Sequence, residues 1–164
     1  IAERFASKPD GAIALLAAGK HYVDKNEPQL FGDLYGMFLQ AYPNNDRAGT
    51  ILFFLATQRK KAGDEAGAAK YFQQIIENYP GDQYYPRALT QVAWSFYQAG
   101  DFESAIAYFR KMVDQTQPGP DRANAQFNLA DSYVRLGKMT EAVTELETLM
   151  KWIAPPNNPY ASST

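Results

Sequence analysis

Three stretches of the sequence repeat one pattern: KAGDEAGAAKYF (residues 61–72), QAGDFESAIAYF (98–109) and RLGKMTEAVTEL (135–146). Each has a glycine at the same place, and Gly63, Gly100 and Gly137 follow one another at intervals of 37 residues. A period of this length is typical of a helical solenoid, in which each repeat packs on its neighbours. Because solenoids present extended surfaces, the repeat favours a function through a binding surface.

Residues 86–117 predict how one repeat folds. Small and apolar residues recur at helical spacing on both sides of Gly100, which predicts two antiparallel helices, each with one buried stripe. Gly100 favours the left-handed conformation that ends the first helix. Asp101 is expected to cap the second helix, where its charge is also favourable.

This pattern resembles the tetratricopeptide repeat. The positions that the family fills with large, small and aromatic residues are occupied here, in order, by Leu89, Val92, Ala93, Phe96, Gly100, Ala105 and Phe109. The resemblance implies an all-α fold, a right-handed α-solenoid of four helix-turn-helix repeats with a 37-residue period. The repeats are expected at about residues 12–45, 49–82, 86–119 and 123–154, within a single domain over residues 1–164.

Four positions depart from the family's pattern. Asn26 replaces the turn glycine of the first repeat, which is physically sensible because Asn tolerates left-handed geometry better than most residues. Phe31 stands where a small residue is usual, so helix packing there is expected to be looser. Arg59 occupies the place of an aromatic residue, which also alters the packing, and Gln126 replaces a large apolar one.

Composition excludes several classes of function. The chain has 164 residues, a net charge of −2 and no cysteine, so disulfides and thiolate metal sites are excluded. Nothing suggests the basic face of a nucleic-acid binder. No apolar run approaches the roughly 18 residues of a membrane span. We therefore expect neither a nucleic-acid partner nor a membrane-spanning segment.

The sequence offers no constellation of catalytic residues. His21 is the single histidine, and no partner for it can be named. Acidic residues at helix starts, such as Asp64 and Asp101, are explained by capping. Phosphate-binding, nucleophile and zinc motifs are absent from the sequence. We predict a protein that is not an enzyme, with no catalytic residue, cofactor or metal.

The resemblance implies that first helices line a concave face, where a peptide or protein segment would bind. The residues predicted to form this groove are Lys20, Phe53, Lys60, Arg87, Gln91, Trp94, Tyr97, Phe127, Asn128 and Asp131. Large aromatic residues and Arg are common anchors of interfaces. The alternative is that rings such as Phe53 and Tyr97 pack between neighbouring first helices. A clamp for a peptide's terminal carboxylate is not supported, because Leu16 and Phe54 are apolar where it needs basic or amide side chains.

The sequence is also compatible with two other functions. Residues 1–7 look like the end of a preceding helix, and no capping helix follows the fourth repeat, which indicates a fragment of a longer array. An uncapped strip on the last helix (Val143, Leu146, Met150, Ile153) would then pair with itself or with missing segments. Alternatively, Tyr84 and Tyr85 could stack on sugar rings of a glycan or cell wall.

The links between repeats bear on where the protein acts. The link NYPGDQYYPRA (residues 78–88) is similar to those of bacterial envelope proteins with tetratricopeptide repeats, including cell-division coordinators and outer-membrane-assembly lipoproteins. This similarity favours an adaptor in the bacterial periplasm or outer-membrane envelope, with the cytoplasm as the alternative.

Overall fold

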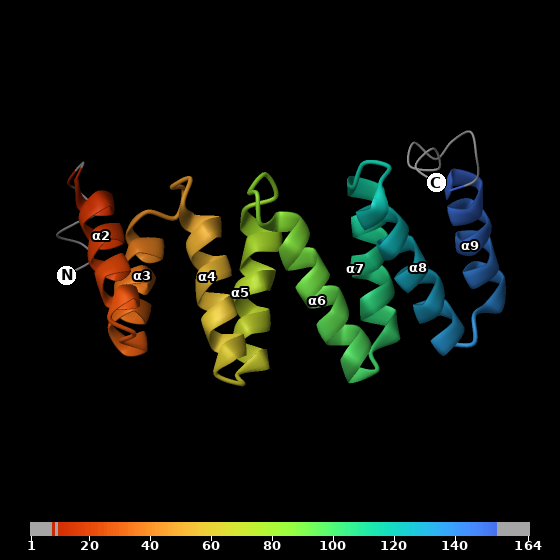
Figure 1. Ribbon diagram of the computed structural model, residues 1–164, viewed down its shortest axis with the longest axis horizontal. Helices are drawn as coiled ribbons and strands as arrows, with labels where there is room; N and C mark the ends of the chain where they lie inside the picture. The colour runs from red at the N-terminus through yellow and green to blue at the C-terminus, as the bar shows by residue number, and fades with distance from the viewer. Residues whose placement is uncertain (1–7, 9, 154–164) are drawn as a thin grey trace, which may run out of the picture. The chain divides into compact units, whose positions relative to one another are not determined.

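The computed structural model describes Lys8 and residues 10–153, and these residues form eight α-helices and no strand (Figure 1). The helices are α2 (Gly11–Asp24), α3 (Pro28–Ala41), α4 (Ala48–Lys61), α5 (Glu65–Asn78), α6 (Tyr85–Ala99), α7 (Phe102–Gln115), α8 (Pro120–Arg135) and α9 (Met139–Ile153). They follow one another as four helical hairpins, which confirms the predicted fold class. The prediction for residues 1–7 and the end of the fourth repeat at residue 154 lie outside the described residues.

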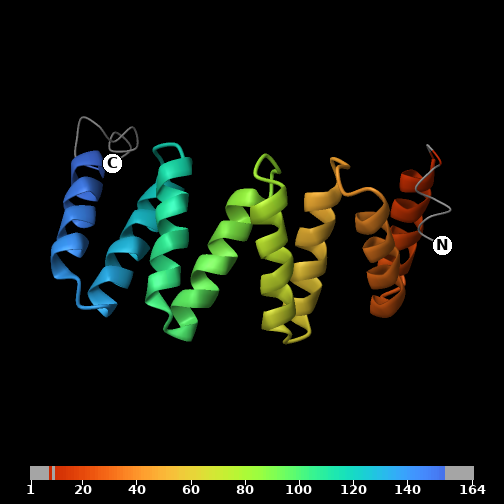
Figure 2. The ribbon, with the colours of Figure 1, turned by 180° about the vertical axis from the view of Figure 1, so that it is seen from behind.

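The chain divides into two compact units. The N-terminal unit comprises Ile1–Tyr85 and holds α2 to α5, and the C-terminal unit comprises Pro86–Thr164 and holds nearly all of α6 to α9. Within them, α2 packs on α3, α4 on α5, and α8 on both α7 and α9, as Figure 2 shows from behind.

The four hairpin turns share one backbone geometry. Gly63, Gly100 and Gly137 have φ of +79°, +79° and +73°, and Asn26 has φ of +56°. At each turn the next residue's N–H donates to the carbonyl five residues back, as Asp101 does to Phe96 at 3.0 Å. This is a Schellman cap, which requires a left-handed residue at the helix end. The prediction that Asn26 is the turn residue of the first repeat is confirmed.

Aspartate caps begin two of the second helices. The Asp64 carboxylate accepts the Gly67 N–H at 2.8 Å, and the Asp101 carboxylate accepts the Ser104 N–H at 3.1 Å. The Ser104 hydroxyl donates to Asp101 as well, at 2.7 Å, and these two hydrogen bonds lower the pKa of the Asp101 carboxyl. Capping therefore explains both carboxylates, as predicted.

Each unit has its own apolar core. In the N-terminal unit it is formed by Leu15, Phe31, Phe38, Ile51 and Leu55. In the C-terminal unit it is formed by Ala93, Ala105, Phe109, Val113, Ala125 and Leu129. The residues that carried the resemblance in the third repeat, such as Leu89, Val92 and Phe109, are buried, so the helical stripes were assigned correctly.

The polar residue in the fourth repeat's apolar stripe is buried in a hydrogen-bonded network. Gln126 is only 4% exposed and donates to Glu145 at 3.3 Å, and Arg110 on α7 pairs with the same carboxylate at 2.6 Å. A buried polar group costs free energy unless it is hydrogen-bonded, so the three side chains depend on one another. They tie α7, α8 and α9 together.

Candidate functional site

The residues predicted for the groove are divided between the two units. Lys20, Phe53 and Lys60 belong to the N-terminal unit. The other seven, Arg87, Gln91, Trp94, Tyr97, Phe127, Asn128 and Asp131, belong to the C-terminal unit.

In the N-terminal unit, the predicted aromatic residue is packed. The half-buried Phe53 ring stacks on Tyr84, with centroids 4.4 Å apart, and meets Phe72 edge-on at 5.6 Å. The alternative interpretation, that this ring serves packing, therefore fits Phe53. Lys20 is an exposed residue that pairs with Asp24 at 2.8 Å, and Lys60 is exposed in the last turn of α4.

In the C-terminal unit, Tyr97 and Asp131 connect two first helices. The Tyr97 hydroxyl on α6 donates a hydrogen bond to the Asp131 carboxylate on α8, and Arg135 lies 3.6 Å from the same carboxylate. This hydrogen bond raises the pKa of Tyr97, since it holds the phenolic proton. Tyr97 therefore acts as a connection between helices, which again fits the packing alternative.

Trp94 and Phe127 are the exposed rings of this surface. Trp94 is 37% exposed, although its ring packs at a steep angle against Tyr97 and Phe109, with centroids 5.3 Å and 5.8 Å away. Phe127, on α8, is 57% exposed. Gln91 and Asn128 are half-buried, and Arg87 is exposed in the first turn of α6. The first helices α6 and α8 thus each present one large exposed ring, and each also has polar groove residues.

The two tyrosines considered for sugar binding are packed. Tyr85 is 8% exposed, and Tyr84 is half-buried against Phe53. In addition, the Tyr84 N–H donates to the Asp82 side chain at 2.7 Å, which fixes the link before α6. This geometry fits the interpretation of link tyrosines as loop anchors and offers no exposed pair of rings.

The strip predicted on the last helix is largely open. Val143, Met150 and Ile153 are exposed, and Leu146 is half-buried. The counterparts of Leu146 and Met150 one repeat earlier, Phe109 and Val113, are core residues of the C-terminal unit. The same face is therefore covered on α7 and uncovered on α9 within the described residues.

A cavity in the N-terminal unit was not predicted as a site. It has a volume of about 360 Å³ and lies between α3, α4 and α5. Two of the sequence departures, Phe31 and Arg59, line it. The sequence therefore marked these two positions, since both residues depart from the repeat pattern and altered helix packing was predicted there.

Over Lys8 and residues 10–153, no three His, Asp or Glu side chains are grouped so that they could hold a metal ion. No helix in that part of the chain is both long and apolar enough for a membrane crossing.

Comparison with known proteins bears on the family. Two models described as tetratricopeptide repeat match residues 52–82 and 90–159, which together make up more than half of the chain. The chain contains tetratricopeptide repeats. No curated protein was found that matches this repeat protein in sequence.

Solved structures share the arrangement of the repeats. The crystal structure of MamA is 18% identical, with a TM-score of 0.59 over 88% of this chain and 74% of that one. YrrB, described as a TPR protein with an unusual peptide-binding site, is 24% identical, with a TM-score of 0.55 over 85% and 68%. BtubC from P. vanneervenii is 16% identical, with a TM-score of 0.58 over 88% and 64%. At these identities the likeness shows the fold.

Proposed function

We propose that this repeat protein is an interaction module that binds a short peptide segment on the α6–α8 face of its C-terminal unit. The observation that carries the proposal is the exposure of Trp94 and Phe127 on this face. Exposed large rings are unfavourable in water, and burying them contributes roughly 25 cal/mol per Å² of apolar surface. Aromatic residues of this size are frequent energetic anchors of protein interfaces.

The surroundings of Trp94 suit a binding surface that is rigid before its partner arrives. The hydrogen bond from Tyr97 to Asp131 connects α6 and α8, and the indole packs on the ring of the buried Phe109. A surface that is already ordered loses less entropy on binding. The amide of Asn128 can donate to and accept from a peptide main chain. Because the exposed rings of Trp94 and Phe127 are apolar, the partner we expect is a segment with apolar side chains.

A peptide selection tests this proposal. Random peptides displayed on phage are selected on the wild-type protein, and the enriched sequences are synthesised and titrated by isothermal calorimetry. We expect Trp94→Ala and Phe127→Ala each to weaken binding by at least about tenfold, in the range of interface anchors. Leu30→Ala is the matched control, since Leu30 is an exposed apolar residue of the N-terminal unit. Equal affinity of the Trp94→Ala variant and the wild type would overturn the proposal.

A second candidate function is self-association through α9. It is favoured by the exposure of Val143, Met150 and Ile153, whose face is covered one repeat earlier on α7. Static light scattering across a concentration series tests it, with Met150→Lys as the variant. Dimers of the wild type that the variant fails to form would support this function, and a wild type that stays monomeric at every concentration would rule it out.

The bacterial-envelope setting stays a prediction that rests on the link sequences. A sugar-binding role is not proposed, because Tyr84 and Tyr85 are packed.

A further inference from the structure

The cavity between α3, α4 and α5 lies where the repeat pattern leads one to expect an aromatic residue and the chain has Arg59. One repeat later, Phe96 on α6 and Tyr108 on α7 stack their rings, with centroids 5.5 Å apart and planes at 16°. Their counterparts 37 residues earlier are Arg59 and Tyr71, and both line the cavity. A guanidinium therefore occupies the sequence position that holds the stacked ring of Phe96 in the C-terminal unit.

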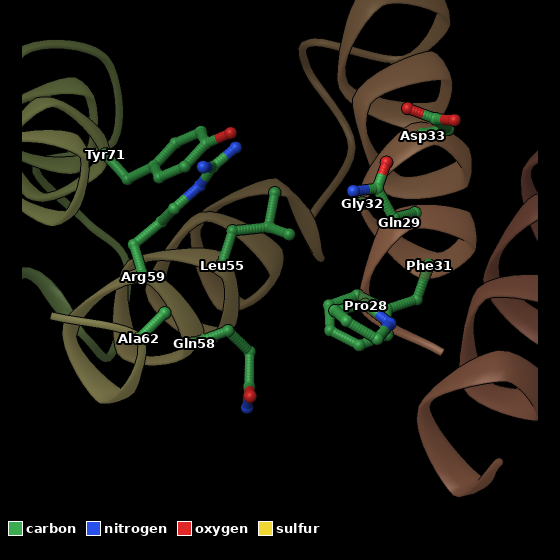
Figure 3. Close-up of a pocket in the computed structure, with 10 residues that line it drawn as sticks. All are labelled: Pro28, Gln29, Phe31, Gly32, Asp33, Leu55, Gln58, Arg59, Ala62 and Tyr71. Atoms are coloured by element: carbon green, nitrogen blue, oxygen red, sulfur yellow. The ribbon is translucent and has the colours of Figure 1, made fainter. Parts of the chain in front are cut away.

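The cavity is lined by apolar side chains on one part of its wall and by polar side chains on another. Phe31 and Leu55 are buried core residues whose side chains form part of the wall. Figure 3 shows Arg59 and Tyr71 together on one wall, with Gln29 and Asp33 on the wall facing them. A volume of about 360 Å³ is at the lower end of the range for small-ligand sites, so a small group fits.

The rim carries a cation, Arg59, and a carboxylate, Asp33, on facing walls, and the Arg59 guanidinium is the group that can bind an anion. The Arg59 side chain is 56% exposed and pairs with Asp64 at 3.4 Å through one guanidinium nitrogen. The Asp64 carboxylate also caps α5 through the Gly67 N–H, so it remains at the helix start. A guanidinium has five N–H donors arranged to bind a carboxylate through two parallel hydrogen bonds. Arg59 therefore retains donors for an incoming anion.

We propose that this cavity binds a carboxylate carried on an apolar body, with the carboxylate on Arg59 and the body over Phe31 and Leu55. The proposal concerns the N-terminal unit and is independent of the peptide surface proposed on α6 and α8. Two sources share this chemistry, namely the C-terminal residue of a peptide and a free aliphatic acid. N-acetyl-leucine represents the first source, and octanoate represents the second.

Nuclear magnetic resonance titration of the whole chain measures this binding, because shifts in α3, α4 and α5 are separate from shifts in α6 and α8. We expect N-acetyl-leucine or octanoate to shift amides around the cavity at concentrations of about 1–10 mM, as is usual for ligands of this size. N-acetyl-leucinamide, which has no carboxylate, should bind at least about tenfold more weakly than N-acetyl-leucine. The stronger of the two acids identifies the source.

Two variants separate the charge from the space. Arg59→Gln removes the cation and leaves the cavity open, so it should weaken binding of either acid at least about tenfold. Arg59→Phe should restore the stacked pair seen at Phe96 and Tyr108, fill the cavity and abolish binding. Lys61→Gln is the matched control, since it removes a positive charge from the same helix end outside the cavity.

Three outcomes would overturn the proposal. The first is that neither acid shifts the cavity amides at about 10 mM, a concentration at which even weak fragments bind. The second is equal binding of N-acetyl-leucine and its amide. The third is that Arg59→Gln binds as well as the Lys61→Gln control. Thermal unfolding of each variant confirms that a loss of binding does not come from a loss of folding.

Discussion

Replacing Tyr97 by Phe removes the hydroxyl that connects α6 and α8. The substitution removes one hydroxyl and keeps the ring, whose edges meet Trp94 and Phe102. The carboxylate of Asp131 then retains Arg135 at 3.6 Å. The change therefore removes the interactions of one hydroxyl, with Asp131 and with Arg135, with little loss of packing.

The magnitude follows from the partners and their exposure. A hydrogen bond to a charged acceptor contributes about 1.5–3 kcal/mol to stability when it is buried. Tyr97 and Asp131 are half-buried, so solvent competes, and we expect a loss of about 1–2 kcal/mol for Tyr97→Phe. For a chain of this size, about 1 kcal/mol corresponds to roughly 2–4 °C in Tm.

Urea unfolding in a double-mutant cycle with Asp131→Asn measures the coupling between the two side chains. We expect a coupling energy of about 1 kcal/mol, because the residues are in direct contact. Tyr108→Phe is the control, since Tyr108 contributes a stacked ring against Phe96, and it should change stability by less than about 0.5 kcal/mol. A coupling energy of zero within error would refute the assigned connection between α6 and α8.

The dependence on pH gives a second readout of the same hydrogen bond. The folded-state pKa of Tyr97 lies above its ordinary value of 10.0, chiefly because its hydroxyl donates to Asp131. A raised pKa means that the stabilisation is fully present below pH 10 and is lost as the pH rises through the folded-state pKa. The stability difference between wild type and Tyr97→Phe should therefore be constant from neutral pH to about pH 9 and shrink above pH 10.

Three further predictions concern the turns and helices. Gly100→Ala should destabilise the chain by about 1 kcal/mol in urea unfolding, because φ of +79° is strained for Ala even though its Cβ would meet open space; Gly100→Asn should cost less. Gly36→Ala, inside α3 with open space around the added Cβ, should raise stability by about 0.5–1 kcal/mol, and a lower Tm would contradict this. Asp101→Ala should lower Tm at neutral pH, and the difference from the wild type should disappear in acid. The pKa of the Asp101 carboxyl is lower in the folded state than its ordinary value of 3.8. Its contribution to stability is therefore present above pH 3.8 and is lost as the pH falls through the folded-state pKa.

The sequence predicted the hairpins because their turns depend on local chemistry. A few neighbouring residues determine a left-handed turn residue, an aspartate cap or a helical stripe. The roles of Gly63, Asp64 and Asn26 could therefore be assigned from their places in the 37-residue period. The partner of each ring could not be assigned in the same way. Phe53 meets Tyr84 through a link whose path depends on tertiary packing, and the same spacing is compatible with an exposed ring.

The departures from the repeat pattern were the least predictable part. Gln126 required an acidic partner on α9, and that partner, Glu145, is 19 residues away in sequence. Arg59 left a cavity whose size depends on how α3 and α4 meet, which residue types do not specify. Comparison of the repeats identified Gln126 and Arg59 as unusual residues. The hydrogen-bonded network and the cavity that follow from them depend on contacts between helices, which the sequence pattern does not give.

The shared hairpin turn also bears on how this chain folds. Each turn joins two helices of 14 to 16 residues through a cap closed by local hydrogen bonds, so each hairpin brings together residues that are close in sequence. Chains dominated by such short-range contacts close small loops first and generally fold fast. Nucleation can then begin at any hairpin and spread to the next. Folding that begins at a hairpin does not depend on how many hairpins follow, so gain or loss of a whole 37-residue block should leave the folding mechanism unchanged. Duplication of one block can therefore lengthen such an array without slowing its folding.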